Sequence, residues 1–71
     1  MNVDKIGSAL LKIYDELKDD PASKDIIILI DEGQSDEKIK EGIVAGVKRL
    51  RELEKNDIAE EIVKKTKGFA F

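Results

Sequence analysis

The chain has no cysteine, no histidine and no tryptophan, and only one proline, one tyrosine and two phenylalanines stand among its 71 residues. Without cysteine and histidine it cannot form disulfides, bind metals through thiolate or imidazole groups, or build the usual pair of nucleophile and base. The sequence therefore predicts no enzyme activity, no metal site and no cofactor. The lack of cysteine leaves the redox compartment open.

Long apolar segments are also missing. No run comes near the roughly 18 apolar residues that a membrane-spanning helix needs. The first residues lack the basic segment and the apolar block of a signal peptide. We therefore expect a cytoplasmic protein that is not transmembrane.

Charged residues make up 41% of the chain, but Leu, Ile, Val and Phe still supply 22 residues, enough for one folded domain over residues 1–71. The net charge of −3 gives no overall attraction to nucleic-acid phosphates. Acids outnumber bases by nine to four in residues 1–36, and bases outnumber acids by nine to seven in residues 37–71. We expect these opposite charges to face each other across packed helices; a partner-binding face is the alternative.

The spacing of apolar residues predicts four helices, at about residues 3–18, 21–32, 36–55 and 58–67. The stripe of the first helix consists of Val3, Ile6, Leu10, Ile13 and Leu17. The stripe of the third consists of Ile39, Ile43, Val47, Leu50 and Leu53. The fourth turns inward Ile58, Ala59, Ile62, Val63 and Thr66. We therefore expect an all-α fold, a compact four-helix bundle in a single helical domain with a short aromatic C-terminal tail.

Residues at the predicted helix ends support these boundaries. Asp20 and Pro21 form a good start for the second helix, because proline fits the first helical position. Ser35 is a favourable cap for the third helix, and Asn56 or Asp57 for the fourth. Gly68 is placed to end the fourth helix in a left-handed conformation.

The Ile-rich stretch at residues 26–30 permits a second interpretation. Because β-branched residues favour strands, it could form a short strand in an α/β fold. We favour a helix because the start signal at Pro21 precedes it and Gly33 is placed to end it, and because the GFAF tail is the only candidate for a pairing strand. As a helix, this stretch should bury Ile26, Ile27 and Ile30 largely and leave Ile28 as its most exposed residue.

Gly42 and Gly46 lie one turn apart in the predicted third helix, where each glycine costs up to about 1 kcal/mol relative to alanine. We expect them to mark a close helix crossing. The crossing helix can belong to the same chain or to a second copy, so a monomer or a homodimer is expected.

Chemical motifs that the sequence suggests fail on inspection. The stretch IIILIDE looks like the strand of a nucleotide hydrolase that ends in two carboxylates, but the phosphate loop GxxxxGK[ST] is absent. The stretch DEGQSDE has the acids of a calcium loop. Counted from Asp31, however, glycine is third instead of sixth, and Gly42 stands where the loop needs glutamate.

A helix-turn-helix regulator is the alternative that would bind nucleic acid. Leu29, Gly33 and Ile39 have the offsets of its packing residue, turn glycine and recognition-helix anchor. The recognition helix would begin with Asp36 and Glu37, whose carboxylates repel phosphates. Nucleic acid is therefore disfavoured as a partner.

Two groups of residues are candidates for binding a protein partner. One is the basic cluster Lys48, Arg49, Arg51 and Lys55, a composition that is more often a solvated face. The other is the tail with Phe69 and Phe71, which either folds back on the bundle or stays exposed as a docking tail. Tyr14, one step off the first stripe, is expected at the edge of the core with its hydroxyl in water.

The order of helix, Asp-Pro, helix, glycine, long helix, short helix and aromatic tail resembles the layout of the small four-helix immunity proteins that protect bacteria from peptide bacteriocins. The closest stretch is LLKIYDELKDDPASKD, residues 10–25, although those proteins are usually longer. No residue role follows from this resemblance. We expect a non-enzymatic protein-protein interaction module, a regulator or immunity-type protein whose partner is another protein. A designed helical scaffold without biological function, suggested by the missing Cys, His and Trp, is a further alternative.

Overall fold

The computed structural model describes residues 3–31 and 33–71, in which the chain forms four α-helices and no strand. The helices are α1, Val3–Leu17; α2, Lys24–Leu29; α3, Asp36–Glu52; and α4, Asn56–Lys65. A single 3-10 turn, η1, Pro21–Ser23, leads directly into α2. The all-α four-helix bundle is confirmed, and the alternative of a strand at residues 26–30 is wrong.

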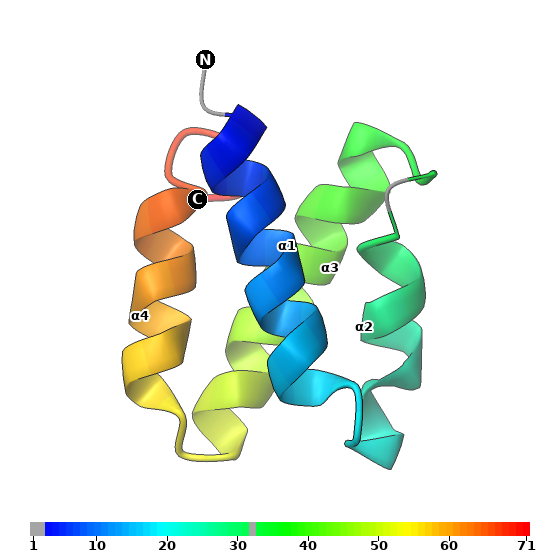
Figure 1. Ribbon diagram of the computed structural model, residues 1–71, viewed down its shortest axis with the longest axis vertical. Helices are drawn as coiled ribbons and strands as arrows, with labels where there is room; N and C mark the ends of the chain where they lie inside the picture. The colour runs from blue at the N-terminus through cyan, green and yellow to red at the C-terminus, as the bar shows by residue number, and fades with distance from the viewer. Residues whose placement is uncertain (1–2, 32) are drawn as a thin grey trace.

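Helix α3 lies at the centre of the bundle. It packs against α1, α2 and α4, and α1 also packs against α4. In Figure 1, α1 crosses in front of α3, with α4 and α2 on either side. The buried apolar residues are Ala9, Ile13, Leu17, Ile30, Ile39, Ile43, Val47, Leu50, Ala59 and Ile62.

The predicted apolar stripes agree with this core in α3 and α4 and differ in α1. In α3 the four residues from Ile39 to Leu50 in the stripe are buried, and Leu53 is partly buried. In α1 the small side chain of Ala9 is fully buried, whereas Leu10 is only partly buried. The buried face of α1 is therefore rotated toward Ala9. A search for large apolar residues misses this rotation because alanine is small. The expected burial of Val3 lies outside the described side chains.

Helix α2 ends at Leu29, and Ile30 follows as its C-cap with φ −91° and ψ 5°. At this helix end the carbonyl of Ile28 accepts two hydrogen bonds, one from the side-chain amide of Gln34 (3.1 Å) and one from the backbone amide of Asp31 (3.3 Å). Gly33 lies four positions beyond Leu29, so the expectation that it ends the helix is wrong. The predicted end at residue 32 is also too late, and Glu32 itself lies outside the described residues.

Burial along residues 26–30 follows the prediction only in part. Ile30 is buried at 6% exposure and Ile28 is the most exposed of the run at 58%, as expected. Ile26 and Ile27 are only partly buried, contrary to the prediction. The reason is that α2 is short and packs mainly on α3, so its side toward α1 is left incompletely covered.

The turn between α3 and α4 forces one residue into an unfavourable conformation. Glu54 has φ 62°, and the amide of Lys55 donates to the carbonyl of Leu50 (2.8 Å) while the amide of Glu54 donates to Arg51 (3.0 Å). These two bonds form a Schellman motif, in which glycine is preferred at the left-handed position. Because the turn is so tight, α3 ends at Glu52 rather than residue 55, and α4 begins at Asn56 rather than residue 58.

Gly42 and Gly46 are both buried, as a close crossing requires, but they face two different helices of the same chain. A Cβ on Gly42 would lie 2.8 Å from the Cβ of Leu29 and 2.7 Å from Cγ2 of Ile30. A Cβ on Gly46 would lie 3.0 Å from Cγ2 of Ile13. The first glycine therefore admits the end of α2, and the second admits α1.

The C-terminal tail folds back onto the bundle. Thr66 is fully buried, and its hydroxyl donates to the carbonyl of Ile62 (2.8 Å). Gly68 has the positive φ expected of it, 89°, but α4 ends at Lys65 with Thr66 as its C-cap, so Gly68 lies in the turn beyond the helix and the predicted end at residue 67 is two residues too late. Phe69 is partly buried against the core, and Phe71 remains 48% exposed.

Candidate binding groove

An open groove of about 310 Å³ lies between α1 and α2. It is lined by one residue of α1, two of the connection and three of α2: Tyr14; Lys18 and Asp20; and Lys24, Ile27 and Ile28. The groove exists because α1 leans on α3 and α4 and makes little contact with α2. On its other flank α1 is joined to α4, where Nζ of Lys65 donates to Oγ of Ser8 (2.9 Å).

Three large apolar side chains are exposed on α1 and α2 and form what we term the apolar patch: Tyr14 at 45% and Ile28 at 58%, which line the groove, and Leu11 at 62%, which does not. Leu11 and Tyr14 are three residues apart on α1 and are therefore neighbours on its surface. Tyr14 and Ile28 both line the groove, one from each helix. Together the three side chains expose on the order of 300 Å², the lower end of the range for the largest patch of a monomeric protein, which is often functional.

Asp20, which lines the groove from the connection between α1 and η1, is held by a network of hydrogen bonds. Arg49 of α3 donates to it through Nε (2.7 Å to Oδ2) and Nη2 (3.2 Å to Oδ1), and the buried Ser23 hydroxyl donates to Oδ2 (2.6 Å). The Arg49 hydrogen bonds, followed by that from Ser23, hold the pKa of Asp20 far below its ordinary value of 3.8. The same ion pair raises the pKa of Arg49. Asp20 is therefore a fixed, compensated charge.

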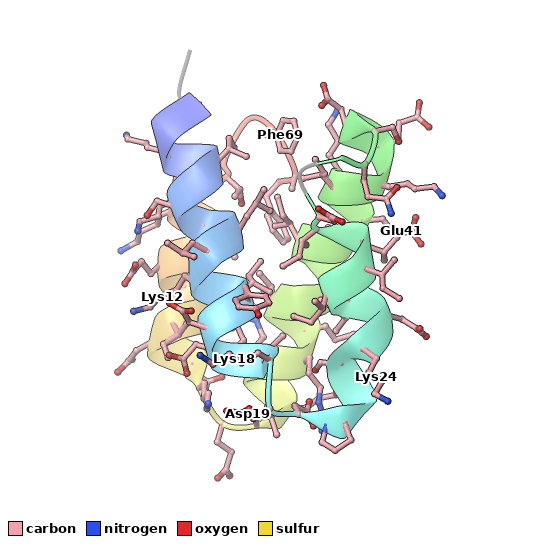
Figure 2. The ribbon with its side chains drawn as sticks, turned by 45° about the vertical axis from the view of Figure 1, so that its right-hand side comes forward. Lys12, Lys18, Asp19, Lys24, Glu41 and Phe69 are labelled. Carbon is pink, nitrogen blue, oxygen red and sulfur yellow. The ribbon has the colours of Figure 1, made fainter. Side chains whose placement is uncertain are left out.

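Lys18 and Lys24 stand at the same end of the groove, one on each wall. Both side chains are exposed, and neither makes an ion pair with any other residue that the structure describes. Figure 2 shows Lys18 at the lower end of α1 and Lys24 at the start of α2, on either side of the connection that carries Asp19. This end of the groove thus presents two solvated ammonium groups.

The basic cluster that the sequence suggested does not form one surface. Arg49 binds Asp20, and Nζ of Lys55 pairs with Glu16 of α1 (3.0 Å). Lys48 and Arg51 are exposed on α3. Two members of the cluster thus join the basic half of the chain to its acidic half, in the arrangement expected from the charge distribution.

The two tail residues proposed for partner binding, Phe69 and Phe71, differ in their surroundings, and neither lines the groove. The ring of Phe69 lies 5.2 Å from Nζ of Lys40, a cation-π contact that ties the tail to α3. Figure 2 places Phe69 at the upper end of the bundle, away from Lys18 and Lys24. Phe71 is exposed but does not line the groove.

Sequence reasoning missed the groove, although one signal for it was present. Leu11 and Tyr14 are apolar residues that lie off the main stripe of α1, which indicates a second apolar face. The contribution of Ile27 and Ile28 has no comparable signal, because their exposure depends on how far α2 stands from α1.

Within residues 3–31 and 33–71, no three potential ligands from His, Cys, Asp or Glu gather closely enough to hold a metal ion. None of the helices in this part of the chain has the length and apolar character needed to cross a membrane. No family model, no curated protein sequence and no solved structure matches the chain. Its function is therefore inferred from its own residues.

Proposed function

We propose that this chain is a non-enzymatic interaction module that binds a short amphipathic helix of a partner protein in the groove between α1 and α2. The observation that carries the proposal is the apolar patch. Leu11 and Tyr14 stay exposed on α1, and Ile28 stays exposed on α2 across the groove from Tyr14, whereas the side of α1 that faces the core buries Ile13 and Leu17 fully.

The size of the patch favours a helix over a second folded domain. A stable interface between folded proteins takes about 800 Å² from each partner, which is roughly a sixth of the 4790 Å² surface of this chain. The apolar patch supplies less than half of that area. A single helix needs only two or three apolar anchors in a groove between two other helices, and this is the geometry that α1 and α2 offer.

The polar groups of the groove favour binding over acid-base chemistry. Asp20 is the one carboxylate among its lining residues, and both of its oxygens already accept hydrogen bonds from Arg49. Because its pKa lies far below neutral pH, it stays ionised and does not exchange a proton there.

The proposal is tested with a synthetic helical peptide that carries leucines at i, i+4 and i+7 and an uncharged polar face. Titrated into the isotopically labelled chain, it should cause saturable chemical-shift changes at Leu11, Tyr14 and Ile28. Tyr14→Ser should weaken binding about tenfold, the usual effect of removing one aromatic anchor. Val44→Ser is the matched control, because Val44 is equally exposed, at 45%, but lies on α3 outside the groove.

Two results would overturn the proposal. One is the absence of saturable shifts at the groove. The other is concentration-dependent dimerisation of the chain alone that is abolished by Tyr14→Ser, since the patch would then bind a second copy. Sedimentation of the chain over a range of concentrations distinguishes this second outcome.

A further inference from the structure

We propose that α2 is a movable wall of the groove, which detaches from α3 as one unit while α1, α3 and α4 stay folded together. Three of the six residues that line the groove belong to α2: Lys24, Ile27 and Ile28. The groove therefore exists only while α2 is in place, and detachment of α2 removes it. The effect on binding rests on the proposed function, whereas the detachment is a property of the chain alone.

Most of the buried core does not depend on α2. Of the ten buried apolar residues in the described chain, nine lie on α1, α3 and α4, and only Ile30, the C-cap of α2, belongs to the α2 segment. None of the six residues of α2 itself is buried, although Ile26 and Ile27 are partly buried. Detachment therefore exposes Ile30, the inner side of α2 and the part of α3 beneath it, and leaves the packing among the other three helices in place.

Helix α2 is attached mainly to one neighbour. It packs chiefly on α3, where Leu29 and Ile30 approach the backbone at Gly42, and it has little contact with α1. Helices α1 and α4, in contrast, each pack both on α3 and on each other. Figure 1 shows α2 at one side of the bundle and α4 at the other. A single interface therefore has to separate for α2 to leave.

The polar contacts that join the other helices do not pass through α2. Three such contacts connect α1 and the segment after it to α3, α4 and the turn between them: Asp20 with Arg49, Glu16 with Lys55, and Ser8 with Lys65. Lys24 and Asp25, the charged residues of α2, form no ion pair with any residue that the structure describes. The hydrogen bond from Gln34 to the carbonyl of Ile28 comes from the connection that follows α2 and not from another helix. The three-helix remainder thus keeps these contacts when α2 detaches.

Native-state hydrogen exchange of the intact chain, measured by NMR in urea below the unfolding transition, tests the proposal. The amides of Ile28, Leu29 and Ile30 should exchange through one shared opening, with protection at least about tenfold below that of the Val47 amide in α3. The urea dependence of this opening should be above zero but smaller than that of global unfolding, because only part of the buried surface becomes exposed.

Two results would overturn the proposal. Protection and urea dependence equal to those of Val47 would mean that α2 unfolds only with the whole chain. Protection that declines residue by residue toward the ends of α2, without urea dependence, would mean fraying and not the release of a unit.

A pair of variants tests independently whether α2 is a separate unit. Ile30→Val and Ile62→Val each remove one methyl group from a buried isoleucine, the first at the end of α2 and the second in α4. Ile62 stays buried when α2 detaches, so Ile62→Val should lower the protection of the Val47 amide about threefold to tenfold and leave that of the α2 amides unchanged. Ile30→Val weakens the attached form alone and should lower both by a similar factor.

An equal loss of protection at α2 and at Val47 in Ile62→Val would contradict the proposal, because the four helices would then open as one. Both measurements are made without a peptide. Their outcome is therefore separate from that of the peptide titration that tests the proposed function.

Discussion

Single residues at helix crossings determine how closely the helices of this bundle can approach. Gly7, Gly46 and Gly42 illustrate three degrees of crowding: a Cβ at Gly7 would meet nothing within 4 Å, at Gly46 it would lie 3.0 Å from Ile13, and at Gly42 it would lie 2.8 Å from the Cβ of Leu29. Ile13 is fully buried and cannot turn aside, and the Leu29 Cβ moves only with the backbone of α2.

We therefore expect a graded effect of alanine at these positions. Gly7→Ala should raise the free energy of unfolding by up to about 1 kcal/mol through helix propensity. Gly42→Ala should lower it by about 2 kcal/mol, because overpacking exceeds that gain. Gly46→Ala should lie between the two, with a net loss. Urea denaturation measures all three, and a Gly42→Ala variant as stable as Gly7→Ala would contradict the close approach of α2 to α3.

The positive φ of Glu54 gives a second prediction at the scale of one residue. A left-handed conformation costs a non-glycine residue about 1–2 kcal/mol. Glycine avoids this cost, but it loses more backbone entropy on folding, which offsets part of the gain. Glu54→Gly should therefore stabilise the chain by up to about 1 kcal/mol in thermal or urea unfolding. Glu54→Ala removes the same carboxylate but keeps the strained conformation, so it should give no such gain. Equal effects of the two variants would assign the gain to charge rather than to conformation.

At the scale of elements, α2 is the helix whose orientation is most easily tested. Ile30 is buried at 6% exposure, so Ile30→Ala should cost about 2–3 kcal/mol. Ile28, two residues earlier and 58% exposed, should tolerate alanine within about 0.5 kcal/mol. Paired denaturation curves of the two variants check this. Similar losses at both positions would mean that the helix is rotated about its axis.

The helices that sequence predicts best are those whose signals are local. The stripe of α3 and the Ser35 cap, which accepts from the amide of Lys38, depend on residues within a few positions of each other. The end of α2 depends on Gln34 reaching back to Ile28 and on Leu29 meeting Gly42, so neighbouring residues give no sign of it. The groove cannot be predicted from local sequence for the same reason, because it depends on the separation of α1 and α2.

At the scale of the whole molecule, two ion pairs join the acidic first half of the chain to the basic second half. Asp20 binds Arg49, and Glu16 binds Lys55. The partners are 29 and 39 residues apart in sequence, which is why a search for local clusters assigned Arg49 and Lys55 to a surface for partners. Their side chains instead hold α1 and its connection against α3 and the turn that follows it.

This arrangement predicts how stability changes with pH. Because the pKa of Asp20 is lower in the folded chain than its ordinary 3.8, the unfolded chain binds the proton more readily. The contribution of Asp20 is therefore complete at neutral pH and is lost progressively as the pH falls from about 5 through the folded pKa. Asp20→Asn should be less stable than the native chain at pH 7, and the difference should shrink in acid.

The neighbouring Asp19 provides the control for this measurement. Asp19 is exposed and has no hydrogen-bond partner among the described residues, so Asp19→Asn should leave the pH dependence of unfolding close to that of the native chain. Denaturation of the native chain, Asp20→Asn and Asp19→Asn at pH 7, 5 and 3 distinguishes the contributions of the two aspartates to stability. A pH-independent difference between the native chain and Asp20→Asn would rule out the ion pair as its cause.

The position of Tyr14 has an optical consequence. The chain has one tyrosine and no tryptophan, so its near-ultraviolet fluorescence comes almost wholly from a ring that lies in the groove. A helix that covers this ring without carrying tyrosine or tryptophan of its own will change the intensity of the tyrosine emission of the native protein, with no dye attached. The molecule thus contains a built-in optical signal at the one place where occupancy is proposed.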